Sequence, residues 1–243
     1  MRTDPGGKWL PGILPCQDPY MTQPTRRTRT TRATYHHGDL RAALIGAGIE
    51  LARTGGPEAV VLREVARLVG VAPNSAYGHF KTLAELKAAV AKQALCELGA
   101  AMAAQVASVP EPSDPRAAAV SHLREVGRAY VQFALDEPGL FRTAMDGNPS
   151  GVGTPGSPGH EPVPDPEGRP QPDAILLAAL DRLTVAGCLP PEETGAAVVA
   201  SWATVHGLAT ILVNLQPDLS PTERTAAIDN GLRVLLLGIT ALG

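Results

Sequence analysis

The sequence is poor in cysteine and in aromatic residues, and both shortages exclude classes of protein. Its 243 residues include three cysteines, Cys16, Cys96 and Cys188. Their wide spacing gives no Cys-x-x-Cys pair and no Cys/His ligand pattern, so we expect neither a disulfide framework nor a metal site. Aromatic residues make up 4% of the chain, although 44% of its residues are hydrophobic. Most apolar side chains are therefore Ala, Leu and Val, and this composition favours helices over sheets.

Long apolar runs and catalytic motifs are also missing. No uninterrupted apolar run approaches the ~20 residues that a membrane helix needs, and the first 20 residues make a poor signal peptide. We therefore expect a cytoplasmic protein with no membrane partner. The sequence contains no Gly-rich phosphate loop and no nucleophile elbow, so we predict no enzymatic activity and no cofactor. An enzyme would have to rely on Cys188, His206 and the carboxylates Glu192 and Glu193, which form no recognisable motif.

The charged residues are divided unevenly along the chain. Residues 21–87 carry ten Lys and Arg against five Asp and Glu, whereas residues 88–243 carry nine against seventeen. The basic part includes the run from Arg26 to Arg32. A basic first part joined to an acidic second part indicates that the first part meets a polyanion, unless the asymmetry is a chance property of solvated faces.

Apolar spacing and helix-stop residues predict a chain made of helices. The expected ranges are 39–55, 62–69, 73–79, 82–106, 114–136, 138–145, 173–187, 191–214 and 221–241. Asp39 can cap the first helix and Gly70 can end the second. Pro73 suits the first position of the third, and Thr82 with Glu85 has the spacing of a capping box at the start of the fourth.

These elements predict an all-α fold with two domains. Residues 1–34 are expected to form a disordered extension and basic arm, followed by a three-helix helix-turn-helix DNA-binding domain over 35–87. Residues 88–243 are expected to form a second, helical domain. Within it, residues 148–172 are dominated by Pro and Gly and predict a mobile loop, because so few bulky apolar residues cannot form a core.

The stretch 70–80, GVAPNSAYGHF, combines a turn with a short helix, as a helix-turn-helix does. A helix in the major groove needs small or hydrogen-bonding side chains on its outer face, because bases and phosphates lie there. Asn74, Ser75 and Gly78 meet that need. Ala76 and Phe80 are expected to face inward and to pack on the preceding helices.

This stretch, together with Leu-Arg-Glu-Val-Ala at 62–66, resembles the DNA-binding part of the TetR family of transcriptional regulators. The family pattern is close to G-V-S-x-x-x-L-Y-x-H-F followed by a capped helix. The start at 35–40, Tyr-His-His-Gly-Asp-Leu, and the segment Trp-Ala-Thr-Val-His-Gly at 202–207 resemble a TetR/AcrR subgroup with a Trp-His-Gly signature. The resemblance departs at Ala72, where a Ser or Thr is usual, at Leu83, where a lysine is common, and at Gly78, which lacks a side chain.

The resemblance implies a set of DNA contacts. Pro73, Asn74, Ser75 and Gly78 match positions that approach base edges, and Tyr77 and His79 match phosphate-binding positions. The start of the fourth helix and the basic arm would add phosphate or minor-groove contacts. The complete predicted set is Pro73, Asn74, Ser75, Tyr77, Gly78, His79, Lys81, Thr82 and Arg32.

The resemblance also implies a homodimer that binds a palindromic operator in double-stranded DNA and represses until a small-molecule effector releases it. It implies that residues 88–243 form the helical effector-binding and dimerisation domain. The last two helices, 191–214 and 221–241, are the candidates for the dimer interface. The candidate effector residues are His122, Tyr130, Phe133, Phe141, Met145, Trp202 and His206, although ordinary core packing would explain the same pattern. An alternative, motivated by Ala72 and Leu83, is a TetR-like ligand-binding or adaptor protein with weak or lost DNA binding.

Overall fold

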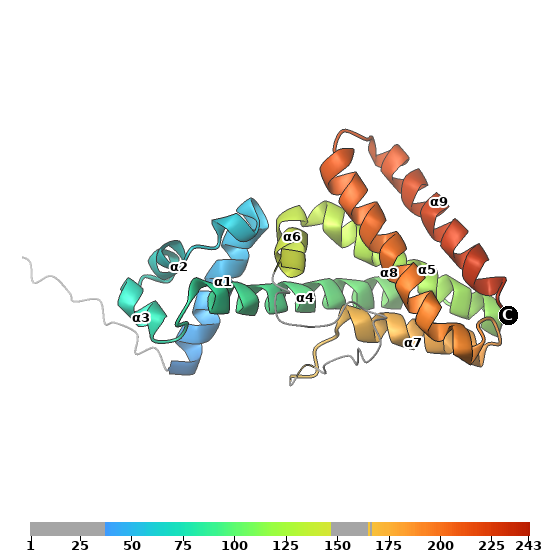
Figure 1. The fold of residues 1–243 in the computed structure, drawn as a ribbon, viewed down its shortest axis with the longest axis horizontal. Helices are drawn as coiled ribbons and strands as arrows, with labels where there is room; N and C mark the ends of the chain where they lie inside the picture. Colours follow the sequence, from blue (N-terminus) through green and yellow to red (C-terminus); the bar gives the residue numbers. More distant parts are fainter. Residues whose placement is uncertain (1–36, 147–164, 166) are drawn as a thin grey trace, which may run out of the picture. The chain divides into compact units, whose positions relative to one another are not determined.

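The computed structural model describes residues 37–146, 165 and 167–243, and all regular structure within them is helical (Figure 1). The predicted all-α fold class is confirmed. The elements are α1 His37–Gly55, η1 Pro57–Ala59, α2 Leu62–Val69, α3 Pro73–Tyr77, α4 Leu83–Ser108, α5 Pro115–Asp136, α6 Pro138–Asp146, α7 Pro172–Val185, η2 Pro191–Glu193, α8 Thr194–Thr210, η3 Ile211–Leu215 and α9 Pro221–Thr240. The predicted arm over 1–34, with Arg32, and most of the predicted loop over 148–172 lie outside the described residues.

The ends of the first four helices follow local chemistry, with small differences from the prediction. α1 begins at His37, two residues before the expected cap Asp39. α2 ends at Gly70, whose φ of 75° lies in the left-handed region that favours glycine. The hydroxyl of Thr82 accepts from the backbone N–H of Glu85 at 3.1 Å. The Glu85 carboxylate accepts from the backbone N–H of Lys81 at 2.7 Å, one residue before the partner that a regular capping box uses.

The first three helices pack around a small apolar core that also includes the start of α4. Leu44 of α1, Val65 of α2 and Ala76 of α3 are buried together with Phe80 and Leu86. The guanidinium carbon of Arg41 lies 4.9 Å from the centre of the Phe80 ring, so a cation–π contact joins α1 to the turn after α3. The expected inward orientation of Ala76 and Phe80 is confirmed. α4 continues through the domain boundary predicted at residues 87 and 88, and that boundary stays a prediction.

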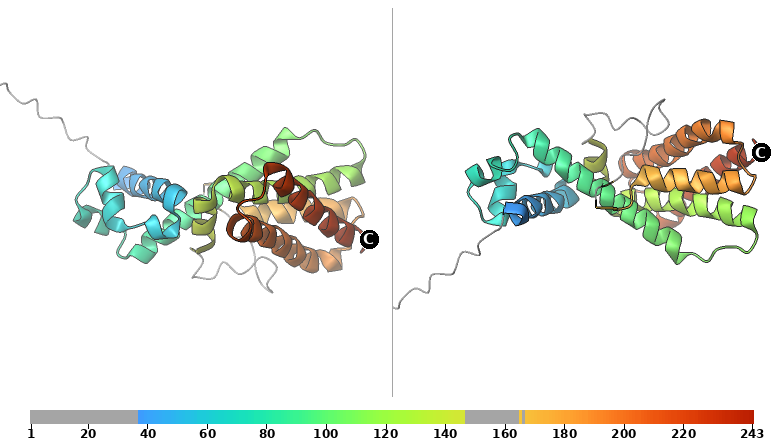
Figure 2. Two further views of the ribbon diagram at one scale, coloured as in Figure 1. Left: turned by 90° about the horizontal axis from the view of Figure 1, so that it is seen from above. Right: turned by 90° about the horizontal axis from the view of Figure 1, so that it is seen from below.

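α5 is the central helix of the second bundle and packs against α4, α7, α8 and α9 (Figure 2). Gly127 allows this close packing: a Cβ there would lie 2.6 Å from a methyl group of Leu232 on α9 and 3.3 Å from one of Val205 on α8. The side chains of Val126, Ala129, Tyr130 and Phe133 on α5 are buried. The long apolar helices of this half therefore pack mainly through one shared neighbour.

α6 joins the second bundle to α1. Its second residue, Gly139, lies so close to the C-terminal end of α1 that a Cβ would be 2.2 Å from the carbonyl oxygen of Ala52. Arg53 of α1 donates to Glu97 of α4 at 3.0 Å and forms an ion pair with Glu137, the residue before α6. A shift of α6 would therefore change the contacts at the C-terminal end of α1 directly.

The last residues of the predicted 148–172 loop lie against α4. The Asp165 carboxylate has no exposed area and accepts from two guanidinium nitrogens of Arg169, at 3.0 and 2.8 Å. Arg169 in turn donates to Gln93 of α4 at 2.7 Å. The hydrogen bonds from Arg169 hold the pKa of Asp165 well below its usual range. This cluster fixes the approach to α7, which begins at Pro172.

Among the described residues, one helical segment is apolar enough to cross a membrane by length and composition alone, although the sequence has no uninterrupted apolar run of that size. It is Pro191–Leu215, 25 residues with a hydropathy of 1.7 in its most apolar window. A third of that window is buried inside the protein, where Ala197, Val205 and Ala209 of α8 are part of the core. A core helix of a helical bundle passes the same test, so the segment is weak evidence for a membrane span.

Candidate functional site

The predicted DNA-binding residues that the structure describes lie on α3 and at its ends. α3 is opened by Pro73 and is capped by Ala72, whose side chain offers no hydrogen bond to the helix start. Asn74, Ser75 and Tyr77 are exposed, the last with 51% of its surface accessible. The sequence therefore produces a short helix with one buried residue, Ala76, and an otherwise solvent-facing surface.

The remaining predicted contacts follow α3 directly in the chain. Gly78 and Lys81 are exposed and His79 is half-buried. Thr82 is exposed and caps α4, whose first N–H groups form the positive end of a 26-residue helix. Leu83, where the resemblance expects a lysine, is 40% exposed. The structure thus brings eight of the nine predicted residues onto one short stretch, and the ninth, Arg32, lies outside the described residues.

Most of the predicted effector residues meet in a second cluster between α5, α6 and α8. We call Tyr130, Phe141, Met145, Trp202 and His206 the aromatic cluster. The Tyr130 hydroxyl lies 3.2 Å from Nδ1 of His206 and 3.8 Å from the sulfur of Met145. The Phe141 ring meets Tyr130 edge-on, with centroids 5.7 Å apart. Trp202 stacks on His206 with ring centroids 4.9 Å apart and planes 6° from parallel.

The polar groups of the aromatic cluster are neutral at neutral pH. Burial raises the pKa of the Tyr130 hydroxyl above its usual range and lowers the pKa of His206, because both charged forms lose hydration. The His206 imidazole on α8 pairs with the phenol of Tyr130 on α5. Ser201, which directly precedes Trp202 on α8, is buried, and its hydroxyl has no hydrogen-bond partner among the described residues.

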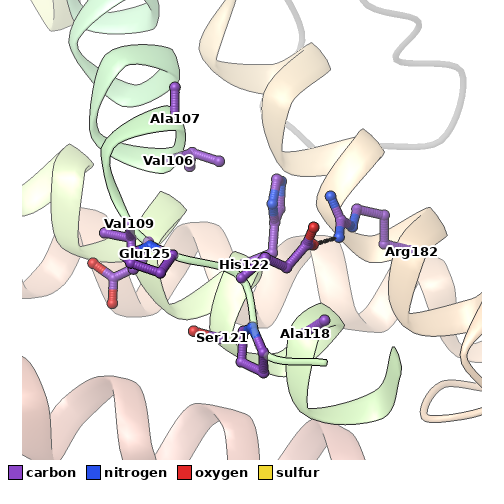
Figure 3. A pocket seen from close by; sticks show the side chains of 11 residues that line it. Val106, Ala107, Val109, Ala118, Ser121, His122, Glu125 and Arg182 are labelled. Atoms are coloured by element: carbon purple, nitrogen blue, oxygen red, sulfur yellow. Dashed lines mark hydrogen bonds and ion pairs between the residues drawn. The ribbon is translucent and has the colours of Figure 1, made fainter. Parts of the chain in front are cut away.

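Two of the predicted effector residues lie outside this cluster. Phe133 is buried on α5, but no ring contact within the described part of the chain joins it to the others. His122 lines a cavity of about 260 Å³ where α4 turns into α5 (Figure 3). Burial lowers the pKa of His122. Glu125 and Arg182 also line this cavity, and Arg182 is paired with Glu111.

No motif in the sequence indicated the ion pairs that connect helices. Arg53 and Glu97 are 44 residues apart, and neither stands in a motif. Cys96 and Cys188 are buried free thiols. Within the described ranges, no three His, Cys, Asp or Glu side chains gather as metal ligands would. Two features of the structure suit binding: an exposed polar helix next to the start of α4 and an uncharged aromatic cluster on α5, α6 and α8.

Comparisons with known proteins agree with this arrangement. Residues 123–235 match the family described as "Tetracyclin repressor-like, C-terminal domain". No curated protein matches the chain.

Several solved structures share the fold. A protein of unknown function from Rhodococcus sp. RHA1 superposes with a TM-score of 0.59 at 23% identity, covering 85% of this chain and 98% of its own. A variant of TetR from Acinetobacter baumannii AYE, in complex with minocycline, gives 0.56 at 20% identity, with 86% and 98% covered. A TetR family transcription regulator from Marinobacter aquaeolei VT8 gives 0.53 at 16% identity, with 80% and 94% covered. At these identities the likeness shows a common fold.

Proposed function

We propose that this chain is a TetR-type transcriptional regulator, which represses transcription as a homodimer on a palindromic operator and leaves it when a small molecule binds the aromatic cluster; the family match over 123–235 and the shared fold support this. The observation that carries the DNA-binding part is the short helix α3. It is exposed except for Ala76 and lies next to the capped start of α4. A helix of this kind can enter the major groove while the N–H groups of α4 face a phosphate. Such a protein acts in the cytoplasm, where the DNA is.

An apolar surface on α8, η3 and α9 supports the homodimer. Val234 and Leu237 of α9 are 62% and 58% exposed, and Leu215 at the end of η3 is 72% exposed. Val199 of α8 and Ile211 of η3 are also exposed apolar residues. α8 and α9 pack on each other and lie side by side in Figure 2. A two-fold axis beside this surface would pair α8 and α9 with their copies in a four-helix bundle. The same surface accounts for the apolar composition of Pro191–Leu215 without a membrane.

The interface can be tested with the double variant Val234→Glu, Leu237→Glu. Both side chains are exposed in one chain, so the fold should survive, whereas two carboxylates per copy would repel across the interface. We expect sedimentation equilibrium to show dimers for the natural protein and monomers for the variant. Val185→Glu, at an exposed apolar residue of α7, should stay dimeric. A double variant with unchanged dimer affinity would contradict the proposed interface.

The aromatic cluster suits an uncharged, flat aromatic effector. Its five side chains carry no charge at neutral pH, and the parallel Trp202 and His206 rings offer a face for stacking. The Tyr130 hydroxyl and His206 imidazole can exchange their mutual hydrogen bond for one with a ligand. A buried charge on the ligand would have no counter-charge among these five residues.

Helix α6 is the element through which such a ligand would act on DNA binding. It carries Phe141 and Met145 of the cluster, and its first turn contacts α1 at Gly139. A ligand that moves α6 would therefore move α1, on which the DNA-binding helices pack. In the proposed dimer, the ligand would change the distance between the α3 helices of the two protomers, so that they no longer fit the operator. Ligand and operator would therefore weaken each other's binding.

The DNA-binding proposal is tested with DNA from upstream of the chain's own coding region. We expect fluorescence anisotropy to show binding that weakens steeply with salt, as phosphate contacts require. The double variant Tyr77→Phe, His79→Ala should lose affinity, and the single variant Tyr77→Phe, which keeps the fold, should lose part of it. Asp181→Asn, an exposed change on α7, serves as the control. Unchanged affinity in the double variant, or no DNA binding at low salt, would favour the adaptor alternative.

A further inference from the structure

The surface that α3 offers to DNA carries no charged side chain. We call Ala72, Pro73, Asn74, Ser75, Tyr77 and Gly78 the reading surface, because all six residues are exposed around the short helix. Neither Lys, Arg, Asp nor Glu occurs between residues 68 and 80. Ala76, the remaining residue of this turn, is buried.

This composition limits which base edges the helix can read in the major groove. Guanine is read mainly by Arg or Lys, and cytosine by the carboxylate of Asp or Glu. Adenine is read by the side-chain amide of Asn or Gln, and the thymine methyl group by small apolar side chains. The reading surface lacks the first two kinds of side chain. It has the last two in Asn74 and in the adjacent pair Ala72 and Pro73, while the hydroxyl of Ser75 can both donate and accept and so selects no base.

Asn74 is free to make such a contact. It is the second residue of α3, and residues at the start of a recognition helix are those that reach base edges. Its backbone carbonyl accepts from the N–H of Gly78 at 3.3 Å. The amide group of its exposed side chain makes no hydrogen bond within the described part of the chain. Both its donor and its acceptor are therefore available for the paired contact with N6 and N7 of adenine.

The nearest cations belong to neighbouring elements. The Nε of Arg67, on α2, donates to Glu64 at 2.8 Å. Lys81 is exposed beside the start of α4, where N–H groups already favour a phosphate. These positions suit neutralisation of the DNA backbone, which fixes the register without reading sequence.

We propose that the core of each operator half-site is built from A·T pairs. In this arrangement Asn74 bonds an adenine and the Ala72–Pro73 edge contacts the methyl group of a neighbouring thymine. The inference rests on the proposed DNA binding and adds the class of base pair that is read. Tyr77, at the other end of the helix, then contacts the backbone.

The test begins with selection of bound sequences from a random double-stranded DNA pool, using the full chain. We expect inverted half-sites with A·T pairs at the same core positions. Each core pair of the selected operator is then replaced by G·C, and the dissociation constants are measured by fluorescence anisotropy. At the pair read by Asn74, the natural protein should lose about tenfold in affinity on replacement, a typical cost of one lost bidentate base contact.

Two variants distinguish base-specific recognition from sequence-independent attraction to the phosphates. Asn74→Ala should bind both DNAs, with the difference at that pair reduced from about tenfold to less than about twofold. Lys81→Ala should weaken binding to every sequence by a similar factor and leave the tenfold difference intact. Because both side chains are exposed, circular dichroism should show the natural helix content in each variant.

The outcomes distinguish this inference from the function on which it rests. Core positions occupied by G·C, with binding that depends on phosphate contacts, would overturn the A·T reading and leave the regulator intact. Core A·T pairs whose preference survives Asn74→Ala would also overturn it, because groove shape would then be what is read. Absence of any selected sequence at low salt would overturn the proposed function and the inference together.

Discussion

The contact between α6 and α1 predicts that Gly139→Ala destabilises the protein although it adds a single methyl group. The new Cβ would lie 2.2 Å from the carbonyl oxygen of Ala52 and 2.5 Å from that of Arg53. Both atoms belong to the backbone of α1, so no side chain can turn aside. To restore ordinary van der Waals separation, α6 must move from α1 by roughly 1 Å.

The size of the effect follows from two opposing contributions. Overpacking of this kind costs typically about 1–3 kcal/mol. Replacing glycine by alanine within a helix returns up to about 1 kcal/mol. We therefore expect a net loss of about 1–2 kcal/mol in the free energy of unfolding, which lowers the thermal midpoint of a protein of this size by roughly 2–8 °C.

The assay is chemical and thermal denaturation followed by circular dichroism, at one protomer concentration because dimer stability depends on it. Gly46→Ala is the matched control: Gly46 lies on α1, and no atom is within 4 Å of its added Cβ. That variant should gain up to about 1 kcal/mol from helix propensity alone. A Gly139→Ala protein at least as stable as the natural one would refute the proposed closeness of α6 and α1.

Three further predictions concern single side chains. Thr82→Ala should cost about 1 kcal/mol in urea denaturation because the N-cap of α4 is lost, whereas Thr82→Ser should be nearly neutral. The pKa of Asp165 is lower in the folded than in the unfolded protein, so the ionised carboxylate stabilises the fold above about pH 4. This stabilisation is lost as the pH falls through the pKa of the folded state. Asp165→Asn should therefore be less stable than the natural protein at pH 7, and the difference should shrink in acid. Burial lowers the pKa of His206, so the unfolded state binds more protons than the folded state below about pH 6.5. The free energy of unfolding should therefore fall between pH 7 and pH 5. In His206→Gln the free energy of unfolding should fall less over the same pH range.

The helix boundaries in the first part of the chain could be predicted because they depend on local residues. α2 has the predicted bounds, since its apolar stripe and the left-handed Gly70 lie within nine residues. The cap of α4 depends on Thr82 and Glu85, which are three residues apart. α1 begins two residues before the predicted start, which is within the one or two residues by which helix ends commonly vary.

The contacts among the candidate effector residues could not be predicted from local sequence. Their apolar and aromatic character indicated that they pack within the helical second domain, but it did not indicate which of them contact one another. Eight residues along a helix separate two side chains by about 12 Å, and His122 lines a cavity at the α4–α5 turn while Tyr130 meets His206. The predicted roles of these residues, like those of the DNA contacts, stay predictions.

By itself, the sequence determined the helical class, the short helix that follows Gly70 and Pro73, and the uncharged surface of that helix. These features depend on residue type and on spacings of a few positions, so chain order is enough to specify them. Only the tertiary structure decided that α6 packs on α1 through Gly139, that Arg53 joins three elements, and that the aromatic cluster draws on α5, α6 and α8. These contacts join residues that are tens of positions apart, and chain order does not specify which distant side chains pack together.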